Sequence, residues 1–241
     1  MEFIIILTIF TIIYILLKFI FSVKIKKIKE YENDKDLDKI VSKYPENVEI
    51  CKEILKKVNN TEVKIEEDKE ANTTLYLVMS NKIFIANLNK SYTRIQTIAH
   101  ECLHSIQDKK ILWSNFIISN VYLAYFFIIA ILGILKVLPY KMLFLSIFLI
   151  LGLVYYLIRT YLENDAMIKA RYLAKEYMEE KNISSKEEIE QIVKKYDELN
   201  NIGIKFVNFK FFEGIIIKAV LLSFIFLIFW DKGDRLNLSH F

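Results

Sequence analysis

The sequence has 241 residues, of which 54% are hydrophobic, and its formal net charge is +4. Soluble domains contain about 45–50% apolar residues, and here the excess lies in four long apolar runs separated by charged stretches, which is typical of a polytopic membrane protein. The basic residues are not concentrated as a nucleic-acid partner would require. The two cysteines lie far apart in the sequence, which excludes a disulfide framework and favours a reducing compartment.

Residues 1–22 contain the first apolar run, which extends from Phe3 to Phe21. Its length is about that needed to cross a bilayer core of roughly 30 Å. A cleaved signal peptide would begin with basic residues and end with small ones, and this segment does neither. Four lysines follow the run and none precedes it, which predicts an uncleaved transmembrane anchor with its N-terminus outside the cytoplasm.

Residues 23–111 form a long polar segment. Residues 49–58 have apolar side chains at a helical spacing. Residues 74–79 and 82–86 are predicted to be two short strands, joined by a tight turn at Ser80-Asn81. These strands either offer an edge to an extended peptide or cover the helix that follows them.

That helix is predicted over residues 91–110, with Ser91 as its N-cap, and it contains the pattern His-Glu-Cys-Leu-His at residues 100–104. In a helix, His100 and His104 lie one turn apart on the same face, so both imidazoles can bind one metal ion. Glu101 lies beside the first ligand, where it can accept a proton from a metal-bound water. The alternative is a helix in which two histidines coincide without a role.

Three more transmembrane helices are predicted in the rest of the chain. Residues 112–158 form a transmembrane hairpin, residues 159–210 are polar and helical in pattern, and residues 211–241 contain the fourth span and a short tail. Lysine and arginine concentrate in the two large polar segments, so we expect these segments to face the cytoplasm. The predicted fold is mainly α, with four transmembrane helices in the cell membrane and a small cytoplasmic α+β domain.

A catalytic zinc ion usually has three protein ligands, so a third ligand is needed. His240 lies on the opposite side of the membrane in the predicted topology. Glu163 follows the third span by five residues, and His104 precedes the second span by eight, so both are expected at the same membrane surface. We therefore predict Glu163 as the third metal ligand. The alternative is that the segment Glu163-Asn164-Asp165 merely caps a membrane helix.

At residues 99–107 and 163–166 the chain resembles the YugP-type neutral zinc metallopeptidases, and more distantly the HtpX-type and CAAX prenyl proteases. The resemblance implies zinc ligands at His100, His104 and Glu163 and a general base at Glu101. One departure is Leu103, which stands where these proteins commonly have a small residue. Asp165 either orients a histidine or is a surface residue.

We therefore expect a membrane-embedded zinc endopeptidase, with its active site facing the cytoplasm, that cleaves membrane-proximal polypeptides and has the lipid bilayer as its other partner. Four side chains are equivalent candidates for stabilising the oxyanion: Tyr92, Tyr161, Arg159 and Arg171. One alternative is a catalytically degenerate peptidase, or a membrane protein with a structural zinc site, that acts as a binding module. A transporter is disfavoured, because intramembrane charges are few and no inverted repeat is evident.

Overall fold

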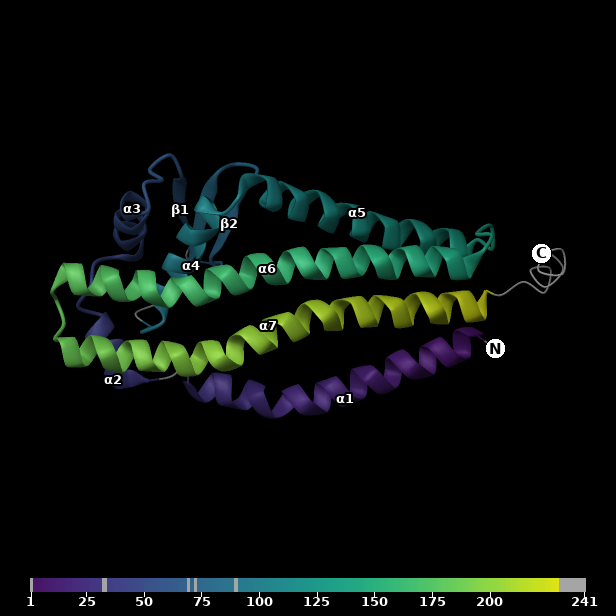
Figure 1. The fold of residues 1–241 in the computed structure, drawn as a ribbon, viewed down its shortest axis with the longest axis horizontal. Helices are drawn as coiled ribbons and strands as arrows, with labels where there is room; N and C mark the ends of the chain where they lie inside the picture. Colours follow the sequence, from purple (N-terminus) through teal and green to yellow (C-terminus); the bar gives the residue numbers. More distant parts are fainter. Residues whose placement is uncertain (1, 32–33, 69, 72, 89–90, 230–241) are drawn as a thin grey trace. The chain divides into compact units, whose positions relative to one another are not determined.

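The computed structural model describes residues 2–31, 34–68, 70–71, 73–88 and 91–229. This part of the chain contains seven α-helices and three short strands (Figure 1), in agreement with the predicted mainly α fold and small sheet. In chain order the elements are α1 (Glu2–Tyr31), α2 (Lys35–Val41), α3 (Asn47–Lys57), β1 (Lys64–Asp68), β2 (Leu75–Leu77), β3 (Lys82–Ala86), α4 (Arg94–Ile106), α5 (Lys109–Ile134), α6 (Lys141–Lys181) and α7 (Lys186–Ile228).

Helices α5, α6 and α7 are long and apolar enough to cross a membrane, judged by length and composition alone. They contain the second, third and fourth apolar runs of the sequence. The first run is present as a shorter apolar part of α1, Phe3–Phe19, among the residues whose side chains are described. Helices α6 and α7, with 41 and 43 residues, extend far beyond their apolar runs, so each also forms part of the polar segment 159–210.

The chain divides into two compact units. We call the first the helical unit and the second the mixed unit. The helical unit comprises Met1–Ser22, Ser114–Thr160 and Val207–Phe241, and the mixed unit comprises Val23–Trp113 and Tyr161–Phe206.

Within the helical unit, the helices approach closely at two glycines. A Cβ atom on Gly133 would lie 2.7 Å from the ring of Phe226, and one on Gly152 would lie 3.1 Å from Ile215. Phe226 is fully buried in the core of this unit. Small residues at such positions let helix backbones pack closely, as is common between helices in lipid.

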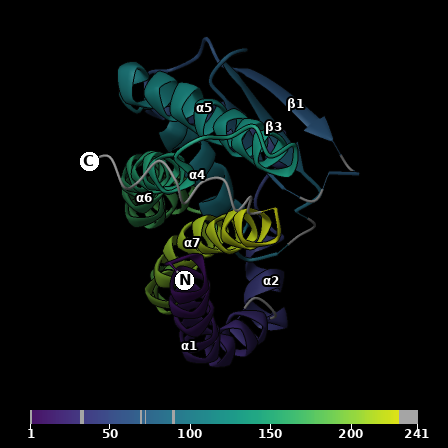
Figure 2. The ribbon, with the colours of Figure 1, turned by 90° about the vertical axis from the view of Figure 1, so that its right-hand side faces the viewer.

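The mixed unit contains a three-stranded sheet with the strand order β1-β3-β2. The central strand β3 is parallel to β1 (Figure 2) and antiparallel to β2, where Tyr76 lies opposite Ile83. Ile83 and Ile85 of β3 are fully buried in the core, as the alternation of side chains along a strand allows. Because β2 pairs on one side only within this sheet, its other side is a free edge.

The strand prediction is correct in part. Both predicted strands exist, but β2 covers only Leu75–Leu77, and a connection of residues 78–81 replaces the two-residue turn, with Asn81 at a φ of 47°. The sequence did not predict β1, which reads Lys-Ile-Glu-Glu-Asp and has four exposed side chains. A strand with so few apolar residues lacks the alternation by which strands are recognised.

Helix α4 is shorter than the predicted helix over residues 91–110. It begins after Thr93, and Ser91 is not its N-cap. Ser91 instead forms a hydrogen bond to the hydroxyl of Thr93, with 3.0 Å between the two oxygens. The helix ends at Ile106 because Gln107 has an extended backbone, and Asp108 then caps α5 by accepting a hydrogen bond of 2.7 Å from the Lys110 N–H.

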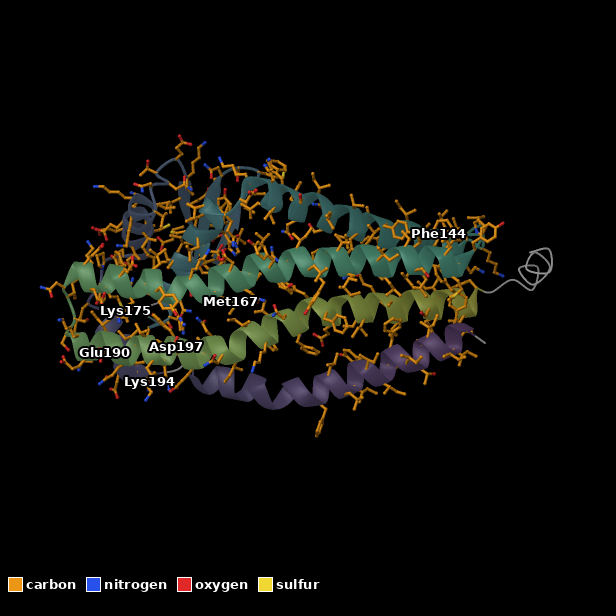
Figure 3. The ribbon with its side chains drawn as sticks, in the orientation of Figure 1. Phe144, Met167, Lys175, Glu190, Lys194 and Asp197 are labelled. Carbon is orange, nitrogen blue, oxygen red and sulfur yellow. The ribbon has the colours of Figure 1, made fainter. Side chains whose placement is uncertain are left out.

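Helices α6 and α7 also pack together within the mixed unit. Met167 of α6 lies 3.3 Å from the position of a Cβ on Gly203 of α7. Arg171 of α6 forms an ion pair with Asp197 of α7. Met167 and Asp197 are both labelled in Figure 3, which shows the region where these helices run side by side. This packing holds in place the part of α6 that carries Glu163.

Arg94, the first residue of α4, is a buried cation, with only 3% of its surface exposed to solvent. Its guanidinium donates hydrogen bonds to the carbonyls of Val41, Tyr44 and Pro45 and to the side-chain oxygen of Asn47, over distances of 2.8–2.9 Å. Arginine suits this position because its planar group has several donors in a fixed arrangement. The start of α4 is thereby fastened to the connection between α2 and α3.

Replacing Arg94 with Met is expected to lower the free energy of unfolding by at least about 3 kcal/mol, because each buried carbonyl left unpaired costs about 1–3 kcal/mol. Thermal unfolding of the detergent-solubilised chain, followed by circular dichroism, measures this effect. Lys52→Met, at an exposed position of α3, is the control and should change stability by less than about 0.5 kcal/mol. Equal unfolding temperatures for the two variants would contradict the role assigned to Arg94.

Candidate metal centre

Two histidines and a glutamate converge in the mixed unit. His100 and His104 lie on α4, and Glu163 lies on α6. The Nε2 atoms of His100 and His104 are 3.0 Å apart, and they lie 3.3 Å and 3.7 Å from the Oε2 and Oε1 atoms of Glu163, respectively. Among the described residues, this is the one group of three or more His, Cys, Asp or Glu side chains close enough to share a metal ion. His240 lies outside the described residues.

The three side chains approach one another at distances close to those around a tetrahedral metal ion, with a different oxygen of Glu163 nearest to each histidine. Ligands bound at about 2.0–2.2 Å in this geometry lie about 3.3–3.6 Å apart. The observed separations of 3.0, 3.3 and 3.7 Å are close to that range. Two imidazoles and one carboxylate suit zinc and several other divalent transition metals. The three residues therefore form a possible metal-binding group.

Glu101 lies beside this group and is held by a strand. Its Oε2 accepts a hydrogen bond of 2.7 Å from the Tyr76 N–H of β2, and its Oε1 lies 3.9 Å from Nε2 of His100. Burial raises the pKa of Glu101, and the nearby His100 and His104 act in the opposite direction. One carboxylate oxygen is thus fixed by the backbone of β2, while the other lies near the ligand atoms.

The charges of the site affect His104 as well. Burial lowers the pKa of His104, but the nearby carboxylates of Glu163 and Glu101 and the hydrogen bond with Gln107 outweigh this effect, so the pKa is raised. The site therefore attracts positive charge. A divalent cation bound by the same atoms would satisfy the two carboxylates in place of a proton.

Gln107 is the functional residue that the sequence analysis missed. Its Oε1 lies 2.7 Å from Nδ1 of His104, and its Nε2 donates hydrogen bonds of 2.8 Å to the Leu162 carbonyl and 3.2 Å to Oδ2 of Asp165. Asp165, considered as a partner of a histidine, contacts Gln107 instead and forms an ion pair of 2.6 Å with Lys169. The one sign of this contact in the sequence was the position of Gln107, an amide residue three positions after His104.

The opposite side of α4 is packed into the core. Ala99 and Cys102 are fully buried, and Leu103 is 7% exposed. The Sγ atoms of Cys102 and Cys51 are 3.8 Å apart, and both thiols are free. Burial raises the pKa of Cys102, so this thiol stays protonated. The bulk of Leu103, the departure from the family pattern, is accommodated by the core.

The four candidate oxyanion donors lie in different surroundings. Tyr92 is fully buried in the core, where its ring stacks on Tyr196, so it is a core residue and not a donor to a substrate. The guanidinium of Arg171 is paired with Asp197. Tyr161 is 59% exposed, and Arg159 lies in the helical unit with its guanidinium over the ring of Phe211.

Comparison of the chain with protein families, with curated proteins and with solved structures gives no match. The chemistry of the site is therefore argued from its own residues.

Purified protein is expected to bind about one zinc ion per chain, and Glu163→Ala is expected to lose most of it, because two histidines alone leave the ion without its third protein ligand. Elemental analysis after equilibration with limiting zinc measures this. Glu190→Ala is the matched control, since Glu190 is an exposed carboxylate of α7 (Figure 3). Equal zinc content in the two variants would show that Glu163 is not a ligand.

Proposed function

We propose that the chain is a membrane-embedded, zinc-dependent endopeptidase. The observation that carries the proposal is the convergence of His100, His104 and Glu163, with the Glu101 carboxylate beside them. The pattern His-Glu-x-x-His supplies two ligands and a base on one helix, and the third ligand comes from another helix, as in zinc peptidases of the YugP type. Zinc is proposed as the ion because two histidines and one carboxylate are a frequent ligand set of catalytic zinc.

His100, His104 and Glu163 would hold the zinc ion, which supplies Lewis acidity that polarises the peptide carbonyl and acidifies the attacking water. Glu101 accepts the proton of that water and delivers it to the leaving amine. Burial raises the pKa of Glu101, and a carboxylate with a raised pKa accepts a proton more readily than an exposed one. The Tyr76 N–H bond keeps the carboxylate oriented during both transfers.

An extended polypeptide is proposed to bind along the outer edge of β2, where it would donate an N–H to the Tyr76 carbonyl, because the Tyr76 N–H is already bonded to Glu101. The Tyr76 N–H points to Glu101 and therefore away from β3, so the carbonyl of the same residue also faces the outer edge. Leu75, Leu77 and Met79 are 36%, 40% and 65% exposed along this strand and its end. A peptide strand added to this edge would place alternate side chains against these apolar residues. The proposed substrates therefore have apolar residues near the cleaved bond.

The membrane location is proposed from the long apolar helices. Glu163 lies in α6 five residues after Ile158, the end of the apolar run, which is about 8 Å along a helix. This short separation supports a site near the bilayer surface and substrates that are themselves membrane-proximal. The apolar part of α1 is proposed as a fourth span, and the concentration of lysine and arginine in the polar segments favours a cytoplasmic site.

Glu101→Gln is expected to reduce peptide hydrolysis by a factor of about 10²–10⁴, because the amide cannot accept the proton from water. Zinc content should stay the same, since Glu101 is not a proposed ligand. The assay is cleavage of a quenched fluorescent peptide library by zinc-loaded protein, with Glu190→Gln as the control. Equal turnover by wild type and Glu101→Gln would contradict the proposed function.

Leu77→Lys is expected to raise KM about tenfold for peptides with apolar residues beside the cleaved bond, because a charged side chain replaces an apolar contact. Because Leu77 supplies no group to the proposed proton transfers, kcat should change little. Ile183→Lys is the control, since Ile183 is a 37% exposed apolar residue between α6 and α7. An unchanged KM would show that substrates do not bind along β2.

A further inference from the structure

We propose that Gln107 is a positioning residue of the metal centre. It selects the tautomer of His104 that can bind metal, and it connects this ring to the turn of α6 that carries Glu163. The inference rests on the proposed function, because it concerns the same ligands. It also predicts which nitrogen of His104 carries the proton in the metal-free protein, and this prediction can be tested independently.

The surroundings of Gln107 fix the orientation of its amide group. The Leu162 carbonyl and the Asp165 carboxylate are both hydrogen-bond acceptors, and they lie 2.8 Å and 3.2 Å from Nε2. An amide oxygen in this position would face two acceptors without a donor. The NH2 group must therefore point to α6, and the amide oxygen must point to His104.

The orientation of the amide then determines the tautomer of His104. The Gln107 oxygen accepts only, so the Nδ1 atom of His104, 2.7 Å away, must carry the proton and donate it. In a neutral imidazole, Nε2 is then unprotonated and has a free lone pair. Nε2 is the atom that points to His100 and Glu163, so the selected tautomer is the one required of a metal ligand.

Gln107 also links the two helices that supply the ligands. Its acceptors Leu162 and Asp165 lie on either side of Glu163 on α6, and Lys169 fixes the other oxygen of Asp165 through an ion pair of 2.6 Å. Helix α4 ends at Ile106, and the backbone of Gln107 is extended, so Gln107 does not follow the course of the helix. One side chain thus contacts a histidine ligand and two residues that flank the carboxylate ligand on α6.

The tautomer is measured by nitrogen NMR of the metal-free full-length chain in detergent micelles, with its three histidines labelled with ¹⁵N. The measurement is made at a pH where the imidazoles are neutral, and His240→Gln assists the assignment. In wild type, Nδ1 of His104 should be protonated and Nε2 unprotonated. A protonated Nε2 on His104 in wild type would overturn the proposal without any variant.

Two substitutions separate the role of the acceptor from that of bulk. Gln107→Met, of similar length but without an acceptor, should give a mixture of His104 tautomers. Gln107→Glu should keep Nδ1 protonated, because one carboxylate oxygen accepts the same hydrogen bond, but its other oxygen has no donor for Leu162 and Asp165 and so loses the link to α6. Gln191→Met, at an exposed position of α7, is the matched control and should behave as wild type. An unchanged tautomer in Gln107→Met would contradict the proposal.

Zinc affinity provides the second readout, by competition with a chromophoric chelator. Gln107→Met should weaken zinc binding about 10- to 100-fold, as loss of a partner that orients a histidine ligand commonly does. Gln107→Glu should lose less, and wild-type affinity in Gln107→Met would overturn the proposal. If the wild type binds no zinc, the proposed function fails, but the ¹⁵N spectra still test the role of Gln107.

Discussion

The candidate site depends on the way α4 packs, because this helix serves the core and the metal ligands at once. Ala99 and Cys102 are fully buried on one side, and His100 and His104 face Glu163 on another. With 3.6 residues per turn, positions four apart stay on the same face. The burial of the apolar side therefore sets the direction of both imidazoles, and Arg94 fixes the start of the same helix through four hydrogen bonds.

Much of this fold could be predicted from the sequence, because its strongest signals are long and local. Long apolar runs predicted α5, α6 and α7, and the spacing of the apolar residues between Ile95 and Ile106 predicted a helix at α4. The misses occurred where a structure depends on distant partners. Strand β1 has almost no apolar side chains, and it forms through backbone pairing with β3. The end of α4 depends on the extended backbone at Gln107, which no local propensity indicates.

The site shows the same division. Glu163 was predicted because an even number of spans returns the chain to the same side of a membrane, and the structure places it beside the two histidines. Gln107 was missed because its partners are 55 and 58 residues away in the sequence. Tyr92 was a candidate by nearness in sequence, but its ring is packed in the core. Sequence spacing reveals contacts along one helix, and the number of spans indicates the side of the membrane on which a residue lies, whereas the contacts of Gln107 with α6 need the fold.

The unbroken course of α6 has a mechanical consequence. Glu163 is joined to an apolar segment by continuous helix, a stiff connection, whereas Gln107 and Asp108 interrupt the helical path between His104 and α5. Under the proposed membrane location, a tilt of the apolar part of α6 would therefore reach Glu163 along one continuous helix, whereas the two histidines are joined to α5 through the non-helical residues Gln107 and Asp108. Bilayer thickness changes the tilt of membrane helices. If α6 crosses the bilayer as proposed, metal affinity is expected to differ between detergent and bilayers of different thickness.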